Sequence, residues 1–348
     1  MARQKRIGIL TGGGDCPGLN AAIRATAKTA IRTGYEVIGI HNAWEGFFDE
    51  ETEVLDSAKT SGIIDRGGTI LGTSRISPLK MENGPKLIFD GFEKLGLEAL
   101  VVLGGEGTLS VATRLFKMGL PVVGIPKTID NDVMGTDYTI GFQTAVQIAT
   151  DALDRLRSTA ASHHRVMLLE VMGRHTGWIA TYAGMANGAD AILIPEIPLN
   201  AERMKRLYQM LERRNRIDRS FSIVVVAEGT KLEGESVICD SAEASNCGVY
   251  QRGGVGAVIG GIIEKNTGLE TRVSSLDHIQ RGGTPVSYDR NLAIEFGVKA
   301  TRLVKEKKYG EMTALKGNSI IAVPLEKVAN RIKEVNMKVY KVAELFFG

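Results

Sequence analysis

Three short loops in the first half of the chain combine glycines with acidic, hydroxyl or basic side chains, each directly after an apolar run. They are residues 11–20 (TGGGDCPGLN), 104–108 (GGEGT) and 126–132 (PKTIDND). Glycines between a strand and a helix let backbone N–H groups approach a phosphate, and the helix dipole favours its charge. The first loop alone is equally consistent with a tight turn, because it lacks the Lys-Ser/Thr end of a P-loop and the spacing of a dinucleotide fingerprint.

Carboxylates in the second and third loops indicate phosphoryl-transfer chemistry. Glu106 among glycines suits a Mg²⁺ ion beside phosphates, although an acid there could instead stabilise a helix N-terminus. Asp130 and Asp132, with Thr128 and Lys127, offer a general base for a hydroxyl group and a partner for a metal or a charge. A solvated turn is the alternative for this loop. Because ligands bind beyond the carboxyl ends of parallel strands, three such loops favour one shared site.

Arginine and histidine gather in the second half of the chain. Residues 171–177 (VMGRHTG) close one strand-like segment, and residues 277–283 (DHIQRGG) follow another. A set of cationic side chains belongs to this region: Arg165, Arg272, His278 and Arg281. For any single arginine a surface salt bridge is the expected role. As a set they suit a phosphate, because guanidinium forks match phosphate oxygens, and they suggest a phosphorylated substrate.

Strands and helices must position these motifs, and the apolar pattern predicts both. Seven short runs are almost continuously apolar, as strands buried on both faces require. They are residues 6–10, 36–40, 99–103, 122–125, 166–171, 191–194 and 222–227. Amphipathic segments between them, such as 144–158, predict helices. Strands alternating with helices predict an α/β fold with parallel sheets. We expect a break between domains near Gly141 and a surface insertion over 231–254.

Composition limits the class of protein. A chain of 348 residues has room for about two domains. It is 43% hydrophobic and 24% charged, and no apolar run approaches the roughly 18 residues of a membrane span. The net charge of +3 gives no broad field for nucleic acid or another polyanion. The three cysteines (Cys16, Cys239 and Cys247) form no disulfide or zinc pattern, and the basic N-terminus leads into only a short apolar stretch, so we expect a cytoplasmic protein.

Taken together, the motifs resemble those of the 6-phosphofructokinase family along nearly the whole chain. The resemblance rests on residues 13–18 (GGDCPG), 67–75 (GGTILGTSR) and the runs at 104, 126, 172 and 278. It implies two doubly wound parallel-sheet domains with the site in the cleft between them. The donor domain would be 1–141 plus about 282–325, and the sugar-phosphate domain 142–281 plus about 326–348. It further implies a step of glycolysis: Mg²⁺-dependent transfer of a phosphoryl group from ATP to the 1-hydroxyl of fructose 6-phosphate, giving fructose 1,6-bisphosphate.

The resemblance also implies roles for single residues. Asp130 would be the general base, positioned with Thr128, Asp132 and Arg174, and Glu106 would be the acid associated with Mg²⁺. The nucleotide phosphates would be held by Gly14, Arg75, Ile76, Gly105, Glu106, Gly107 and Thr108. The sugar phosphate would be bound by Thr128, Ile129, Asp130, Met172, Gly173, Arg174, Glu228, His278, Ile279, Gln280 and Arg281. Arg165 and Arg272 would complete the site from a neighbouring subunit, so a homo-oligomer, dimer or tetramer, is implied.

Two positions bear on the phosphoryl donor. In relatives that use pyrophosphate, an aspartate typically stands at the position of Gly107 and blocks the place of the nucleotide α-phosphate; glycine here favours ATP. Lys127 is the residue that pyrophosphate users carry, so a reversible pyrophosphate-dependent phosphotransferase is the alternative. A catalytically silent sugar-phosphate sensor is opposed by the presence of both Asp130 and Glu106. A distantly related lipid or dinucleotide kinase would share only the second glycine loop and would lack the cationic set of Arg165, Arg272, His278 and Arg281.

Effector control is left open by the resemblance. Arg24 and Arg157 match effector-binding positions of the bacterial enzymes, Lys28 is a conservative change, and Ser57 replaces an arginine.

Overall fold

The computed structural model describes residues 4–216, 221–233 and 254–348, which form two compact units. Unit 1 comprises residues 1–144 and 281–333, and unit 2 comprises 145–280 and 334–348. The chain therefore crosses between units three times, and the last crossing lies beyond the boundary predicted at about 325/326. Residues 326–333 stay with unit 1, where Ile332 forms a β-bridge with Val133. Cys239, Cys247 and all but the ends of the predicted insertion lie outside the described residues.

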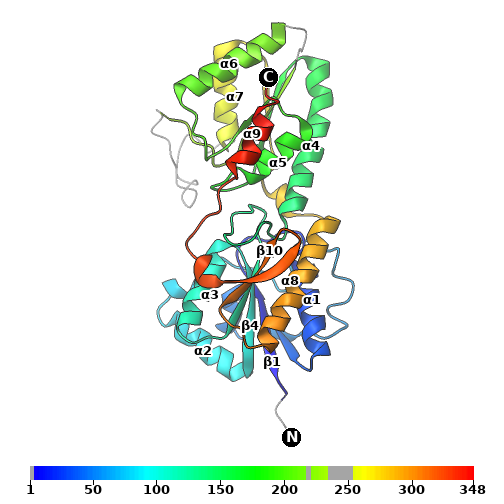
Figure 1. Cartoon of the computed structure of the whole chain (residues 1–348), viewed down its shortest axis with the longest axis vertical. Helices are drawn as coiled ribbons and strands as arrows, with labels where there is room; N and C mark the ends of the chain where they lie inside the picture. The colour runs from blue at the N-terminus through cyan, green and yellow to red at the C-terminus, as the bar shows by residue number, and fades with distance from the viewer. Residues whose placement is uncertain (1–3, 217–220, 234–253) are drawn as a thin grey trace. The chain divides into compact units, whose positions relative to one another are not determined.

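Unit 1 is built on a seven-stranded sheet of order β11-β10-β5-β4-β1-β2-β3 (Figure 1). Its strands are β1 (Arg6–Thr11), β2 (Glu36–Ile40), β3 (Thr52–Val54), β4 (Leu97–Gly104), β5 (Val122–Pro126), β10 (Glu311–Lys316) and β11 (Ser319–Pro324). The five inner strands are parallel, as predicted, whereas β3 and β11 pair antiparallel at the two edges. The β10–β11 connection is a two-residue hairpin with Gly317 at φ +58°, and so short a loop joins only antiparallel strands.

Helices cover both faces of this sheet. They are α1 (Leu19–Arg32), α2 (Gly84–Leu95), α3 (Glu106–Lys117) and α8 (Ser287–Lys305), with short 3₁₀ helices at Ala43–Phe47, Pro78–Lys80 and Leu325–Lys327. In Figure 1, α1 and α8 lie together on one side, and α2 and α3 on the other. Leu100 and Val102 of β4 are fully buried against α3 and its neighbours, and Ile7 and Ile9 of β1 are equally buried. Burial on both faces explains the continuous apolar runs.

Unit 2 has a four-stranded, all-parallel sheet of order β7-β8-β6-β9. Its strands are β6 (Val166–Val171), β7 (Ala191–Leu193), β8 (Ser222–Ala227) and β9 (Thr271–Ser275). Its helices are α5 (Trp178–Asn187), α6 (Ala201–Arg216), α7 (Gly254–Thr267), α9 (Met337–Glu344), a 3₁₀ helix at Asp277–Arg281, and most of α4 (Phe142–His163). Leu211 of α6 and Ile259 of α7 pack on Leu168 and Val226 of the sheet, whereas α5 packs against α9 (Figure 1).

The first turn of α4 is fixed by a buried carboxylate from α8. Asp289 accepts hydrogen bonds from the backbone N–H of Gly141 (3.0 Å) and of Thr144 (2.7 Å), and from the Thr144 hydroxyl (2.6 Å). Burial raises the pKa of Asp289 to about 6. These bonds satisfy N–H groups that a helix start leaves without partners and set where the loop after β5 ends. No helix in the described part of the chain is both long and apolar enough to cross a bilayer.

Candidate active site

The first glycine loop, residues 12–14, joins β1 to α1 and is held by the segment that contains Arg75. The Thr73 hydroxyl donates to the carbonyl of Gly13 (2.6 Å), and the Gly13 N–H donates to the carbonyl of Ser74 (3.1 Å). Arg75 follows with an exposed side chain, and Ile76 is 44% exposed. The structure therefore brings two of the sequence motifs together and leaves an arginine exposed beside the glycines.

Glycine is required at several points of these loops by close packing. A Cβ at Gly12 would lie 2.7 Å from the Thr108 methyl group, and one at Gly104 would overlap the same side chain. At Gly14, by contrast, a Cβ would meet the Arg281 guanidinium, the end of a flexible side chain that can move aside, so this contact does not require glycine. The Thr108 side chain thus joins the loops after β1 and β4, a packing role that the sequence did not predict.

Gly107 differs from these glycines. It lies in the first turn of α3 and is exposed, and apart from its own helix backbone and chain neighbours no atom of the described residues lies within 4 Å of the place where a Cβ would be. Glycine in a helix costs about 1 kcal/mol relative to alanine. Neither a left-handed backbone nor packing among the described residues requires glycine at this position.

Glu106 starts α3 and is oriented by the chain around it. Its Oε1 accepts the Ser110 hydroxyl (2.6 Å) and the backbone N–H of Asn330 (2.8 Å). Among the described residues no group of three or more Asp, Glu, His or Cys side chains is placed to hold a metal ion. A single oriented carboxylate fits Mg²⁺ that enters with phosphates, because Mg²⁺ keeps few protein ligands and takes others from the substrate.

Lys127, at the end of β5, turns its side chain into the protein. The residue is 1% exposed, and its ammonium donates to the carbonyls of Gly12 (3.0 Å) and Gly14 (2.5 Å). Burial lowers the pKa of Lys127. The sequence suggested that the Lys127 ammonium could bind the donor's terminal phosphate. In the structure the ammonium binds two backbone carbonyls of the first glycine loop and so supports that loop from inside the protein.

The loop after β5 presents the predicted general base. Asp130 and Asp132 are 7% and 6% exposed, respectively. The Thr128 hydroxyl lies 3.2 Å from Asp130 Oδ2 and accepts the Asp130 backbone N–H at 3.1 Å. Ile129 is fully buried, so its side chain packs in the core and only its backbone could meet a ligand. Thr128 therefore orients Asp130 at the carboxyl end of β5, where the strand pattern predicted it.

Two residues that the sequence analysis did not single out, Asn131 and Lys333, help to fix the shape of this loop. Asn131, at φ +53°, accepts the N–H of Thr139 (3.1 Å) with its side-chain oxygen and is fully buried. The same oxygen accepts the ammonium of Lys333 (3.0 Å), which also donates to the carbonyls of Thr136 and Asp137. Burial lowers the pKa of Lys333 to about 7, and the Asp132 carboxylate opposes this shift. No local sequence signal joins Lys333 to a loop some two hundred positions earlier.

In unit 2, the loop after β6 is shaped by Glu228 from the end of β8. Glu228 Oε1 accepts the backbone N–H of Gly173 (3.2 Å) and of Arg174 (2.7 Å). Arg174 adopts φ +53° with an exposed side chain, and a Cβ at Gly173 would overlap the Thr176 carbonyl. Left-handed backbone in a non-glycine residue is uncommon and concentrates at binding sites. The predicted sugar-binding residues Gly173, Arg174 and Glu228 therefore lie together.

Gln280 supports that loop from inside. It is fully buried, its side-chain oxygen accepts the Met172 N–H (2.7 Å), and its amide reaches the Ala145 carbonyl (3.4 Å). The sequence placed Gln280 among the substrate contacts; its burial indicates that it positions Met172 instead. His278 is exposed and Ile279 is 67% exposed, in the same 3₁₀ helix.

The predicted phosphate-binding arginines fall into two groups. Arg165 and Arg272 both pair with Glu270 at the start of β9, Arg165 at 2.8 Å. The hydrogen bond from Arg165 holds the pKa of Glu270 below its usual value. Arg281 belongs to unit 1, where its guanidinium lies 3.4 Å from the Asp15 carbonyl. The structure thus brings Arg165 and Arg272 together and sets Arg281 beside the first glycine loop.

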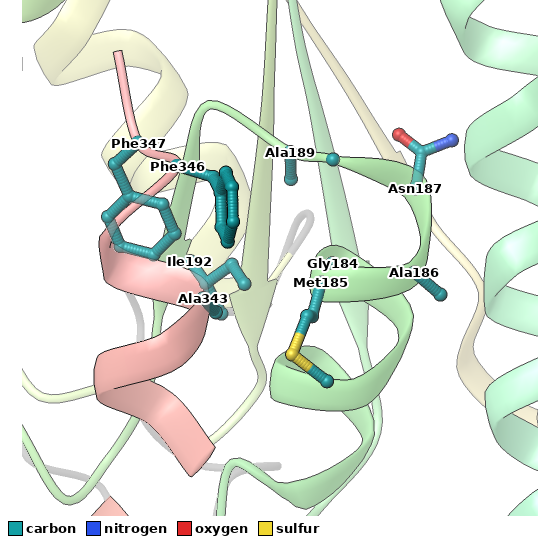
Figure 2. Close-up of a pocket in the computed structure, with 10 residues that line it drawn as sticks. Gly184, Met185, Ala186, Asn187, Ala189, Ile192, Ala343, Phe346 and Phe347 are labelled. Atoms are coloured by element: carbon teal, nitrogen blue, oxygen red, sulfur yellow. The ribbon is translucent and has the colours of Figure 1, made fainter. Parts of the chain in front are cut away.

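Of the positions that match effector contacts, Arg24 and Lys28 lie on α1 and Ser57 is exposed in unit 1. Arg157 of α4 donates to the carbonyls of Asn187 (2.5 Å) and Gly188 (3.2 Å) at the end of α5. Beside this helix end lies a cavity of about 380 Å³ between α5 and the residues after α9, with Phe346 and Phe347 in its wall (Figure 2). It is lined by none of the predicted site residues.

Comparisons with known proteins agree with the resemblance read from the motifs. The model of the family described as "Phosphofructokinase" matches residues 6–304. A protein of Amycolatopsis methanolica named pyrophosphate–fructose 6-phosphate 1-phosphotransferase is 47% identical, covering 99% of this chain and all of that one. An ATP-dependent 6-phosphofructokinase of Chloroflexus aurantiacus is 48% identical, covering 96% of this chain and 94% of the relative. The relatives' names therefore divide between two donors.

Among solved structures, the phosphofructokinase of Pichia pastoris in the T-state has a TM-score of 0.82 and 31% identity. The match covers 99% of this chain but only 37% of the yeast chain, which is much longer. The fold, the order of the glycine loops along the chain and the extent of these matches show that the chain belongs to the phosphofructokinase family.

Proposed function

We propose that this protein transfers a phosphoryl group from ATP to the 1-hydroxyl of fructose 6-phosphate, giving fructose 1,6-bisphosphate. The acceptor is supported by family membership and by the loop that presents Asp130. The donor is supported above all by the open space around Gly107.

Asp130 is proposed as the general base. It would take the proton of the sugar hydroxyl as that oxygen attacks the terminal phosphorus and the bond to the departing nucleotide breaks. The Thr128 hydroxyl lies 3.2 Å from Oδ2 of Asp130, and this hydrogen bond fixes the orientation of the carboxylate. Asp132, two residues later, would add charge for the metal that accompanies the donor. A fixed base that needs no reorientation lowers the barrier mainly through positioning.

Donor phosphates would bind along the glycine loops of unit 1. The N–H groups of residues 105–108 would offer hydrogen bonds at the start of α3, where the helix dipole favours negative charge, and the N–H of Gly14 would offer one from the loop after β1. Arg75, exposed beside Gly13, would neutralise charge that develops on the transferred group. Glu106 would hold Mg²⁺, which, when bound with the donor, draws negative charge from the phosphate oxygens.

The sugar phosphate would bind to loops of unit 2. Met172, Gly173 and Arg174 would contact the sugar, and Glu228 fixes the shape of their loop through its two backbone bonds. His278, Arg165 and Arg272 would bind the 6-phosphate. To do so, Arg165 and Arg272 would give up their ion pairs with Glu270 and bind phosphate oxygens instead. Arg281, held in unit 1, is proposed to stand nearer to the donor than the motif alone implied.

Gly107 carries the choice of ATP. Nothing within 4 Å would obstruct a side chain there, and the helical backbone does not require glycine. An α-phosphate with its nucleoside needs space and the absence of negative charge. A carboxylate at this position would repel a phosphate at a few ångströms by about 4 kcal/mol at an effective dielectric constant near 20.

A pyrophosphate-dependent reversible phosphotransferase is the second candidate, favoured by Lys127 and by the name of the Amycolatopsis relative. The buried position of Lys127 weakens this reading, because its ammonium already binds the Gly12 and Gly14 carbonyls. A lysine with a local supporting role is compatible with either donor.

Steady-state kinetics with both donors, fructose 6-phosphate and Mg²⁺ test the proposal. We expect native turnover to be faster with ATP, Gly107→Asp to abolish ATP use, and Lys127→Gly to leave ATP activity measurable. Gly107→Asp could reveal pyrophosphate use, since Lys127 is already present. Gly261→Asp, at an exposed helical glycine of α7 that also has open space beside it and no left-handed backbone, is the matched control for an added carboxylate. Faster native turnover with pyrophosphate would reject the ATP assignment.

We also propose a cytoplasmic homo-oligomer in which Arg165 and Arg272 serve a neighbouring subunit's site. The cysteine pattern supports the compartment, and the partly exposed positions of Arg165 and Arg272, both paired with Glu270 within unit 2, support the sharing.

A further inference from the structure

Lys333 is the last residue of unit 1, and its side chain reaches the loop that bears the proposed base. Its ammonium lies 3.0 Å from the side-chain oxygen of Asn131, 2.9 Å from the Thr136 carbonyl and 3.0 Å from the Asp137 carbonyl. An ammonium group has three N–H donors, and here three acceptors of a single loop lie within hydrogen-bond distance of it.

The backbone of the same segment also binds the loop. The N–H of Lys333 donates to the Asp132 carbonyl (2.8 Å), and Ile332 forms an antiparallel bridge with Val133. The loop residue between the two carboxylates, Asn131, is held in the left-handed region at φ +53°. A strained backbone persists only where its surroundings determine it, and here Lys333 and the N–H of Thr139 share the Asn131 oxygen.

We infer that Lys333 is a positioning residue for phosphoryl transfer, acting through Asn131 and the carbonyls of residues 136 and 137 to hold Asp130 and Asp132 in place. This inference rests on the proposed function, since it assigns Lys333 to the same reaction. Lys333 touches neither reacting atom. Its effect should appear in turnover more than in the binding of the sugar phosphate, because a small displacement of a catalytic group costs about 10²-fold in rate.

The chain offers a matched control. Lys316 also approaches the loop, but its ammonium pairs with the Asp137 carboxylate (3.0 Å) at the surface, with 51% of its side chain exposed. Both amino groups lie near Asp137, whereas only Lys333 binds Asn131. Lys333→Met and Lys316→Met therefore separate loss of charge near the loop from loss of its support.

We expect Lys333→Met to lower kcat by roughly 10- to 100-fold, with KM for fructose 6-phosphate changed by less than about threefold, the pattern of a lost transition-state arrangement. Lys316→Met should leave both constants near the wild-type values. Lys333→Arg should recover part of the turnover, because it keeps a cation but presents its donors in a planar fork. Should Lys333→Met fail to fold, Lys333→Gln, which keeps one amide donor, takes its place.

Hydrogen exchange of the peptide that contains residues 128–137 provides a readout independent of activity. We expect faster exchange in Lys333→Met and wild-type exchange in Lys316→Met. A folded Lys333 variant with wild-type kcat and wild-type exchange would overturn the inference, as would equal losses in the Lys316 variant. If the wild-type chain transferred phosphoryl groups from neither donor, the proposed function would fall, and the exchange rates alone would decide whether Lys333 holds the loop.

Discussion

At the scale of single residues, the glycines of the candidate site differ in whether packing within the protein requires them. Gly12 and Gly104 have the Thr108 side chain where a Cβ would lie, whereas Gly107 has no such neighbour among the described residues within 4 Å. The first two maintain the shape of the loops. We propose that Gly107 leaves space for the donor, and for that reason it is the position at which donor choice is tested.

Asp130 gives a second prediction at this scale. Asp130→Asn should leave fructose 6-phosphate binding nearly unchanged while lowering turnover by roughly 10²- to 10⁴-fold, the usual range for loss of a general base. The measurement is kcat together with the dissociation constant of the sugar phosphate. Asp90→Asn, an exposed carboxylate on α2 of the same unit, is the control. An unchanged kcat in Asp130→Asn would remove Asp130 from the mechanism.

At the scale of secondary-structure elements, β6 and α7 are joined by a buried carboxylate. Glu170 of β6 is 5% exposed and accepts the backbone N–H of Gly256 in the first turn of α7 (2.5 Å). Gly254 adopts φ +71°, and a Cβ there would overlap the carboxylate. Burial raises the pKa of Glu170 to about 7, and the nearby Asp277 and Glu228 carboxylates add to this shift.

This arrangement predicts a pH dependence of stability. Between about pH 4.5 and pH 7 the folded chain keeps the Glu170 proton and the unfolded chain releases it, so stability should fall as pH rises, by up to about 3 kcal/mol. Glu170→Gln cannot ionise and should remove this decline, making the variant more stable than wild type at pH 8 and similar at pH 5. Urea unfolding followed by Trp178, after Trp44→Phe, reports on unit 2.

Glu264→Gln, an exposed position on α7, should keep the wild-type decline. Parallel stability curves for wild type and Glu170→Gln over this pH range would contradict the assignment of the effect to Glu170.

At the scale of the whole molecule, the proposed sharing of sites between subunits can be measured. Arg165→Ala or Arg272→Ala should each raise KM for fructose 6-phosphate, with a loss of roughly 1.5–3 kcal/mol per charged hydrogen bond. At fructose 6-phosphate concentrations well below the raised KM, where Arg272→Ala turns over little substrate, mixing it with Asp130→Asn under conditions of subunit exchange should restore partial activity, because some sites would then receive both wild-type residues. No recovery despite demonstrated exchange would show that each site belongs to one chain.

The strands that the sequence predicted are those with nearly continuous apolar runs, including the edge strand β7, and most of those that it missed lack such a run. The seven apolar runs correspond to β1, β2, β4, β5, β6, β7 and β8. The others, β3, β9, β10 and β11, contain polar residues or lie partly exposed, and β9 (TRVSS) has no continuous apolar run. A short strand that includes polar residues, such as β10 (EMTALK), has too weak a pattern to stand out from a loop or a helix even where it is buried.

The sequence by itself determined the α/β class, seven strands with continuous apolar runs and the glycine loops of the candidate site, because these depend on local patterns of burial and on glycine at strand ends. Only the tertiary structure decided how particular side chains are used. It turned Lys127 toward the carbonyls of Gly12 and Gly14, buried Gln280 beneath Met172, and brought Lys333 to Asn131. Such contacts join residues far apart in the chain, and they depend on how strands and crossovers pack, which no spacing within a motif records.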